Sequence, residues 1–457
     1  MEADLKKKWD VKKMLLVAGT TMALVAGAAS TLPSAYADGK IKSDDPDKWI
    51  SLGLGLKTSF AAQEHGSANR GSYSNRFGVD FQRFYLNGSI HKYLKFEINT
   101  ECFACPGSIN GAGQGGNITQ GGSTPAPVGA NFFGGNSTIG LLDAVGKFEF
   151  TPQVNLWVGR LLVPGERGEL NGPFFMAVYD GFKTPFNSAD FSGNFGKGGA
   201  GLYARDHGAV FWGQVDPGAG HLQYSAGVFT GLQSSGGTAC AGGPCGPNQQ
   251  GSLMYAGRLT YNFFNAEKNP GYYTSGTYFG KSGDILALAA GLNHQQDGAG
   301  SFGNSSDFTA FIGDLLFEKP LANDGGVITI NAEYKQYFAN YNKTAAFTGG
   351  AGSAAANGCF CMFDGHSYTG YAMYMFPKPL GIGKLQPYAR YTWIQPSESS
   401  TRKETEAGVN YVIDGFNARL TALWQYGDLA TKGLFNFAPG VTGELAHVFK
   451  LALQYQY

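Results

Sequence analysis

The sequence predicts an all-β fold, a transmembrane antiparallel β-barrel of about 16 strands with long external loops. Three observations lead to this prediction: an N-terminal export signal, a recurring alternation of apolar and polar residues, and connectors that alternate between short and long. The chain has 457 residues, of which 34 are Phe, 24 are Tyr and 69 are Gly. A chain rich in aromatic residues and glycine, without long apolar runs, is typical of such barrels.

The N-terminal segment 1–37 has the three parts of a secretory signal peptide. Several lysines precede an apolar run at 14–29, and Ala35-Tyr36-Ala37 forms a small-x-small cleavage site. The apolar run is shorter than the ~20 residues that a membrane-spanning helix needs, although a retained anchor is the alternative. We therefore expect cleavage after Ala37, a single barrel domain at 38–457, and export to the cell outer membrane.

The segment 444–457 shows the alternation most clearly. Apolar residues such as Phe449 and Leu451 alternate there with residues such as Lys450 and Gln454. A period of two places each set on one face of a strand. The same alternation recurs in the runs 94–99, 142–150, 328–338, 385–393, 404–413 and 418–426. A soluble β-sandwich would alternate in the same way, so the connectors have to decide between the two folds.

The connectors between about sixteen strand-like runs alternate in length, as they do in membrane barrels. Tight turns are predicted at 151–153, 216–220, 377–383 and 414–415. Long connectors rich in Gly, Ser and Asn are predicted near 101–139, 164–205, 233–250, 339–365 and 427–443. Two places fit less well, because the run 77–86 loses its register and the connector 266–283 is too long for an ideal turn. Fourteen and eighteen strands are therefore the alternatives.

The long connector 164–205 carries charged residues of both signs, among them Glu166, Arg167 and Lys183. A barrel of about 16 strands leaves an aqueous lumen, which its inward residues line. We expect this connector, the third loop, to fold inward and narrow the pore. The alternative is an external flap that packs on neighbouring loops.

Six cysteines occur as three close pairs, all in predicted long loops. In an oxidising compartment we expect disulfides, either within the pairs or between loops. A structural zinc site and free redox thiols are the alternatives. Haem attachment is excluded, because Pro106 stands where that motif needs His. The disulfide candidates are Cys102, Cys105, Cys240, Cys245, Cys359 and Cys361.

No motif in the sequence predicts catalysis, a metal centre or a cofactor. There is no His-Glu-x-x-His, and no Gly-x-Ser-x-Gly in a strand–turn–helix context. The chain has 34 basic and 34 acidic residues, so it lacks the basic excess expected of a nucleic-acid partner. We therefore expect neither an enzyme nor a nucleic-acid-binding protein.

Short motifs between 140 and 232 occur in a characteristic order. Leu142-Asp143-Ala144 precedes the strand end at 158–166, 204–209 opens the next strand, and 222–224 leads into 227–231. This order resembles the phosphate-selective porin O and P family. The resemblance implies a sixteen-stranded outer-membrane channel, a homotrimer, and a third loop folded into the pore.

The resemblance implies a passive channel for small hydrophilic solutes or ions, with membrane lipid and small solutes or anions as partners. Anion-selective members of the family present arginines and lysines in the pore. The pore-lining and constriction candidates here are Lys95, Lys147, Arg160, Arg167, Lys183, Lys197, Arg205, Arg258, Lys335, Arg390 and Arg419. For Arg160 and Arg205 the alternative role is a structural ion pair. Because acidic residues such as Glu97, Glu149 and Glu333 stand among these cations, we expect weak selectivity and leave a phosphate preference open.

Two other functions stay open. One is a structural sheath, the barrel of a porin–cytochrome electron conduit, which would have an occluded lumen and bind a haem protein. The other is a surface receptor or adhesin that uses the long, cysteine-bearing loops and conducts little.

Overall fold

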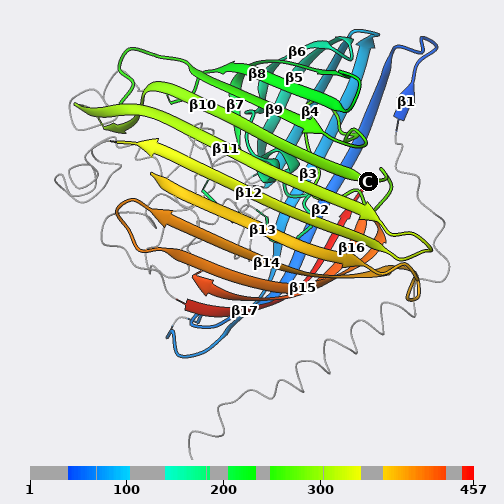
Figure 1. Cartoon of the computed structure of the whole chain (residues 1–457), viewed down its shortest axis with the longest axis vertical. Helices are drawn as coiled ribbons and strands as arrows, with labels where there is room; N and C mark the ends of the chain where they lie inside the picture. The colour runs from blue at the N-terminus through cyan, green and yellow to red at the C-terminus, as the bar shows by residue number, and fades with distance from the viewer. Residues whose placement is uncertain are drawn as a thin grey trace, which may run out of the picture.

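Sixteen strands, β2 to β17, close into one antiparallel β-barrel in the part of the chain that the structure describes (Figure 1). The structure is a computed structural model. It describes residues 40–67, 69–102, 139–181, 183–185, 204–232, 247–301, 303–340, 364–428 and 445–457. The predicted fold class and strand number are confirmed, so fourteen and eighteen strands are excluded. The proposed signal peptide lies outside the described residues.

The barrel is a simple meander in which each strand pairs with its neighbours in sequence. The first eight barrel strands are β2 (Trp49–Gln63), β3 (Ser74–His91), β4 (Leu94–Cys102), β5 (Ile139–Thr151), β6 (Val154–Leu162), β7 (Arg205–Val215), β8 (His221–Phe229) and β9 (Met254–Asn262). The other eight are β10 (Ile285–Ser301), β11 (Asn304–Pro320), β12 (Val327–Ala339), β13 (Gly365–Met375), β14 (Lys384–Pro396), β15 (Arg402–Asp414), β16 (Ala418–Asp428) and β17 (Leu445–Gln456).

The last strand pairs with the first and closes the barrel. β17 pairs with β2 from Val448 opposite Gln63 to Gln456 opposite Gly55. Beyond that point the three-residue strand β1 (Lys40–Lys42) pairs with the start of β2. The edge of β2 is therefore paired by two segments in turn, which removes an exposed strand edge.

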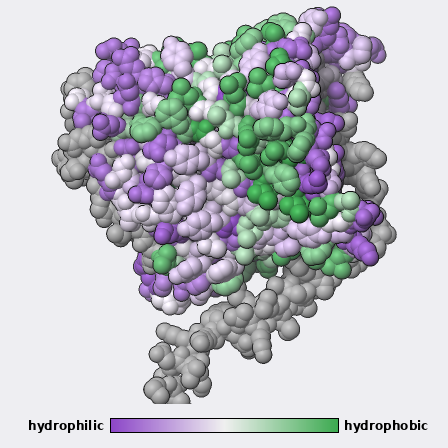
Figure 2. Space-filling model, viewed as in Figure 1, coloured by the Kyte–Doolittle hydropathy of each residue, from purple (hydrophilic) through white to green (hydrophobic). Residues whose placement is uncertain are grey.

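Alternation in the sequence becomes an outer and an inner face of the wall. On β12, Thr329 and Lys335 point inward and are 0% and 2% exposed, whereas Ile330 and Tyr334 point outward and are 41% and 43% exposed. Figure 2 shows hydrophobic residues on the outer wall. Phe311 on β11 is an outward residue that is 51% exposed. An apolar outside around a polar inside is the arrangement of a barrel that faces lipid.

The loss of register near 77–86 is a β-bulge. Lys57 pairs with Phe81 and the next residue of β2, Thr58, pairs with Val79, which leaves Asp80 as an extra residue. An inserted residue reverses the alternation beyond it, so the sequence pattern fails at this point.

The predicted turns at 151–153, 216–220, 377–383 and 414–415 all connect consecutive strands, and we call their end of the barrel the turn end. The opposite end, with the connectors predicted to be long, is the loop end. No helix among the described residues has both the length and the hydrophobicity to cross a membrane.

Candidate functional site

The connector between β6 and β7 enters the barrel from the loop end. Its described part at 163–185, called the inward loop below, contains the short helix α2 (Arg167–Asn171), whose five residues are all buried. Glu166 caps this helix, because its carboxylate accepts a hydrogen bond of 2.9 Å from the backbone N–H of Glu169. The inward-folded third loop is therefore confirmed for these residues, and the external flap is excluded for them.

The helix α2 is attached to β11 and β12, across the interior from its own strand β6. Lys335 Nζ on β12 lies 2.8 Å from a carboxylate oxygen of Glu166 and 2.7 Å from one of Glu169. The backbone N–H of Arg167 donates to Asp314 Oδ2 on β11 at 3.1 Å. The loop thus crosses the barrel interior within its first few residues.

Basic residues of the wall hold backbone carbonyls of the inward loop. Lys57 Nζ on β2 donates to the carbonyls of Pro173 and Tyr179 at 3.0 and 2.7 Å. Arg419 Nη1 on β16 donates to the carbonyl of Ala177 at 2.8 Å. These contacts satisfy buried carbonyls that have no place in a helix or a sheet.

Asp180 is the main acidic anchor of the inward loop. Lys450 Nζ donates to both of its carboxylate oxygens, at 2.6 and 2.7 Å, and Gln425 Nε2 donates to one of them at 2.8 Å. Arg390 also donates to the backbone carbonyl of Asp180. Burial alone would raise the pKa of Asp180, but the ammonium groups of Lys450 and Lys183 outweigh it and hold that pKa below its ordinary value. The carboxylate is therefore charged at neutral pH.

The connector between β9 and β10 also enters the barrel, from the turn end. We call 263–284 the turn-end connector. Glu318 on β11 accepts hydrogen bonds from Thr277 Oγ1 at 2.5 Å and from the backbone N–H groups of Tyr278 and Gly280 at 2.9 and 2.8 Å. The segment that was too long for an ideal turn is long because it reaches into the interior.

All ten described candidates for the pore wall have a partner inside the barrel. Arg160 Nε and Arg419 Nη1 donate to backbone carbonyls. The other eight form ion pairs: Lys95–Glu149 (2.6 Å), Lys147–Glu97, Arg167–Glu267 (2.6 Å), Lys183–Glu404 (2.9 Å), Arg205–Asp143 (2.8 Å), Arg258–Asp314, Lys335–Glu169 (2.7 Å) and Arg390–Glu406. The interior therefore carries interleaved charges of both signs, and its cations are already engaged.

Several predicted residues lie outside the described part of the chain. These are Lys197 and five of the cysteines: Cys105, Cys240, Cys245, Cys359 and Cys361. Cys102 ends β4, and its side chain is not described. Disulfide pairing stays a prediction. Among the described residues, no group of three or more His, Cys, Asp or Glu side chains is arranged to hold a metal ion.

Four residues that organise the interior were missed in the sequence: Lys57, Asp180, Glu267 and Asp314. Lys57 and Asp314 occupy inward positions of strands, so strict alternation along β2 and β11 could have identified them. Asp180 and Glu267 lie in irregular segments, which have no period to read.

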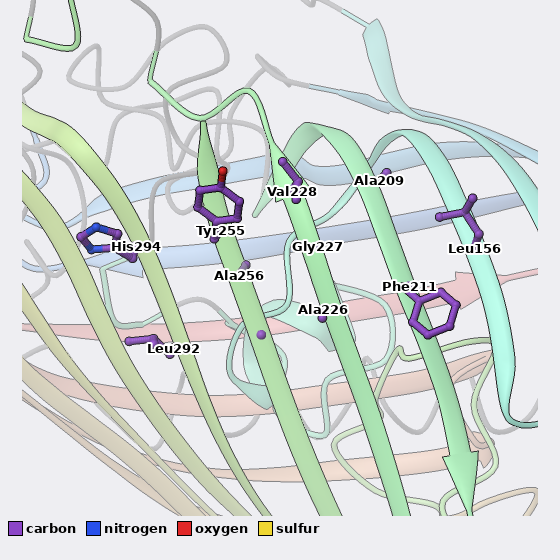
Figure 3. Close-up of a pocket in the computed structure, with 11 residues that line it drawn as sticks. Leu156, Ala209, Phe211, Ala226, Gly227, Val228, Tyr255, Ala256, Leu292 and His294 are labelled. Carbon is purple, nitrogen blue, oxygen red and sulfur yellow. The ribbon is translucent and has the colours of Figure 1, made fainter. Parts of the chain in front are cut away.

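An apolar hollow of about 500 Å³ lies on the outer wall between β6 and β10 (Figure 3). Small residues, among them Ala226 and Gly257, form its floor, and larger ones such as Phe211 and Leu292 border it. Phe211, Val228 and Leu292 are outward residues, 44%, 39% and 46% exposed, so the hollow faces lipid and is not part of a path through the barrel.

No protein-family model and no curated protein matches this chain. Many solved structures are similar to it, among them the following three. OmpT of Vibrio cholerae is 12% identical, with a TM-score of 0.45, over 92% of this chain and 100% of that chain. OmpF of Salmonella typhi, in complex with daunomycin, is 11% identical, with a TM-score of 0.48, over 92% and 100%. An anion-selective porin from Comamonas acidovorans is 13% identical, with a TM-score of 0.48, over 89% and 99%. The similarity concerns the fold alone.

Three features of the fold indicate where in the cell this chain is located: the closed meander, the apolar outer face and the polar interior. The chain is an outer-membrane β-barrel. In lipid every backbone polar group needs an internal partner, and the β17–β2 pairing supplies the last set of these hydrogen bonds.

Proposed function

We propose that this barrel is a porin, a passive channel for small hydrophilic solutes or ions, and not an enzyme. The observation that carries the proposal is the inward loop, which is anchored inside a barrel of sixteen strands. Barrels of this size enclose an aqueous lumen, and a loop fixed in that lumen sets the width of the path. Lys95 and Glu149, on the inner face near the turn end, are 35% and 22% exposed, so water reaches the interior from that side.

We further propose that the channel is weakly selective. The resemblance to phosphate-selective porins supports a preference for anions such as phosphate. The ion pairs of the interior count against it, because a solute anion would have to compete with a carboxylate that is already bound. Arg390 with Glu406 and Arg205 with Asp143 are examples. Rings of a single charge sign give strong selectivity, and this interior mixes both signs.

Single-channel recording in a planar bilayer tests the proposal. The purified protein is recorded in symmetric KCl, then in a KCl gradient, and finally during a phosphate titration. We expect stable open steps, a reversal potential close to zero in the gradient, and no block by phosphate. Phosphate block would favour the anion-selective function instead. A barrel that inserts into the bilayer but never conducts would overturn the channel function.

The sheath hypothesis has less support, because the chain's own segments 163–185 and 263–284 occupy the interior that a haem protein would need. Haem absorbance in the purified complex would revive it. The family resemblance also supports a homotrimer. Chemical cross-linking in detergent should then yield bands up to the trimer, and a monomer band alone would contradict this assembly.

A further inference from the structure

The turn-end connector and the inward loop enter the barrel from opposite ends and meet inside it. We propose that the turn-end connector is a second constriction element, which holds the inward loop through Arg167 and so sets the width and charge of the path. This inference rests on the proposed channel function. It explains why β9 and β10 are joined by a long connector, although the other strands at the turn end are joined by short turns.

Arg167 forms the central contact between the two segments. Its Nη1 and Nη2 donate to the two carboxylate oxygens of Glu267 at 2.6 and 2.7 Å, and Nη1 also donates to the carbonyl of Ser275 at 3.1 Å. Both charged side chains are buried, at 0% and 4% exposure. A bidentate pair of this kind fixes orientation as well as distance.

Three further contacts join the two segments next to Arg167. Thr274 Oγ1 donates to the carbonyl of Arg167 at 2.9 Å and lies 2.6 Å from Asn171 Oδ1. The backbone N–H of Gly276 donates to the carbonyl of Phe175 at 2.9 Å. A side chain at Gly276 would bring its Cβ to 2.6 Å from a backbone nitrogen of the inward loop, so only glycine fits here. The two backbones are therefore in direct contact.

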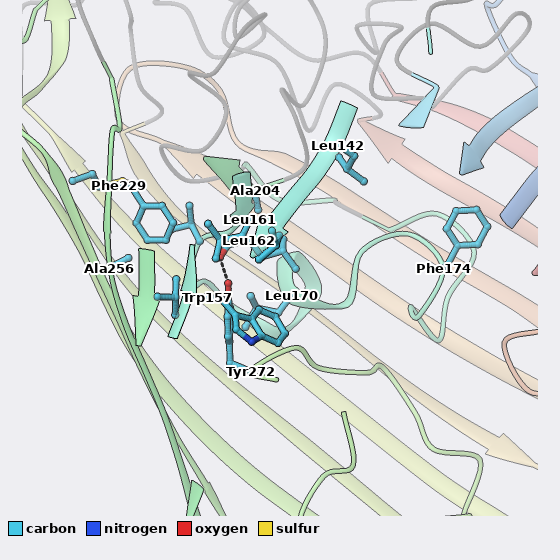
Figure 4. Close-up of a cluster of buried hydrophobic side chains, with 14 of the residues drawn as sticks. Leu142, Trp157, Leu161, Leu162, Leu170, Phe174, Ala204, Phe229, Ala256 and Tyr272 are labelled. Carbon is cyan, nitrogen blue, oxygen red and sulfur yellow. Dashed lines mark hydrogen bonds between the residues drawn. The ribbon is translucent and has the colours of Figure 1, made fainter. Parts of the chain in front are cut away.

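Tyr272 of the turn-end connector adds one more hydrogen bond and an aromatic contact to this junction. Tyr272 OH donates to the carbonyl of Leu162 at 2.5 Å, drawn as a dashed line in Figure 4. Its ring lies 5.4 Å from the ring of Trp157, which is fully buried, and Leu170 of α2 belongs to the same cluster. Aromatic contacts at this separation are stabilising.

The turn-end connector is attached to several walls of the barrel. Gln223 Nε2 on β8 donates to the carbonyl of Gly271 at 3.0 Å, and Tyr371 OH on β13 donates to the carbonyl of Gly276 at 2.7 Å. Glu318 on β11 accepts a hydrogen bond from the backbone N–H of Gly280, near the C-terminal end of the connector. The connector is therefore fixed inside the barrel between β8 and β13.

Glu267 contributes a negative charge to this junction. Burial alone would raise the pKa of Glu267, but the Arg167 guanidinium outweighs it and holds that pKa below its ordinary value. The second carboxylate near the guanidinium is Asp314, with an oxygen 3.4 Å from Arg167 Nε. Neutralising Glu267 would make this part of the interior more positive and would weaken the attachment of the inward loop.

The test compares Glu267→Gln with Asp284→Asn in planar-bilayer recordings. Asp284 ends the same connector, but its ion pair with Lys319 is about half exposed at the edge of the barrel, so Asp284→Asn is the matched control. We expect Glu267→Gln to raise both the unit conductance and, by at least about twofold, the anion-over-cation permeability ratio. The control should behave like the wild type. Equal values in both variants and the wild type would overturn the proposal.

A disulfide cross-link tests the contact without any recording. Asn171 and Thr274 are replaced by cysteines, and the joined peptide is sought after non-reducing digestion, which separates it from native cysteine peptides. We expect dissolved oxygen to oxidise the two thiols to the disulfide and to take up the two electrons and two protons released. Asn171→Cys combined with Lys281→Cys, an exposed position of the same connector, should not form one. If the 171–274 link does not form, the proposed contact between the turn-end connector and the inward loop is overturned, even if the barrel conducts. A barrel that carries the link but conducts no ions would overturn only the channel function.

Discussion

At the scale of single residues, the basic side chains of the wall act as anchors. Lys57, Arg390 and Arg419 each donate to backbone carbonyls of the inward loop. A buried cation is costly unless it is hydrogen-bonded or paired, and a loop inside a barrel has carbonyls that need donors. The two requirements are met together, so these cations are not available to bind a solute anion.

Replacing Asp180 by Asn should destabilise the folded barrel by about 3–5 kcal/mol, because Lys450 would remain buried without its carboxylate. Guanidinium unfolding followed by tryptophan fluorescence measures the change. The double variant Asp180→Asn with Lys450→Gln should recover part of the loss, since it removes the unpaired charge as well. A single variant as stable as the wild type would show that this ion pair does not anchor the loop.

The attachment at Asp180 should also survive moderate acid. Its pKa in the folded protein lies below the value of 3.8 for an unperturbed aspartate. A carboxyl group whose pKa is lowered by folding stabilises the folded protein at any pH above its pKa in the unfolded chain. This stabilisation is lost as the pH falls through the pKa of the folded protein. We therefore expect single-channel noise to stay constant from neutral pH to about pH 4. Noise that rises with a midpoint near pH 6 would contradict this.

At the scale of elements, irregularities in strands position the inward loop. The bulge at Asp80 turns its carboxylate toward Tyr179, whose OH donates to Asp80 Oδ2 at 2.7 Å. The bulge therefore adds a loop contact to β3 at the point where the alternation of its sequence fails.

Gly159 on β6 is a second irregularity and gives a clean test. Its φ is +136°, and an added Cβ would lie 2.0 Å from the carbonyl oxygen of Ala144 on β5. Gly159→Ala should therefore cost at least about 1–3 kcal/mol. Gly146→Ala is the control, because a Cβ at Gly146 would meet nothing closer than 3.8 Å. Unfolding curves of the two variants, with heat-modifiability on gels, should separate them, and equal stability would refute the strain argument.

At the scale of the whole molecule, the protein is polar inside and apolar outside. The outward residue Phe311 stands near the middle of β11, and Ser305 is an outward residue near the loop end of the same strand. Phe311→Arg should cost about 2–4 kcal/mol in a bilayer, whereas Ser305→Arg should cost about 0–1 kcal/mol, because a charge is least tolerated at the membrane midplane. Folding into lipid vesicles over a urea series measures both. Equal costs would mean that the middle of β11 does not face lipid.

The interior, in contrast, holds two segments from opposite ends, and neither segment is a regular element over most of its length. Their charges are paired with the wall or with each other, as in Lys335 with Glu169 and Arg167 with Glu267. The molecule is therefore a barrel whose interior is partly filled by two ordered segments, and not an open tube with charged walls.

The sequence by itself determined the barrel and most of its turns, and it predicted about sixteen strands with fourteen and eighteen as alternatives. These features depend on local signals, since alternation and turn residues are read over a few positions. The bulge at Asp80 obscured the alternation along β3.

Only the tertiary structure decided what the interior residues do. Lys450 and Asp180 are 270 positions apart, and Arg167 and Glu267 are 100 apart. Irregular segments have no period, so their partners cannot be read from spacing. Whether a lysine faces water or binds a carbonyl depends on which distant segment the closed barrel brings against it.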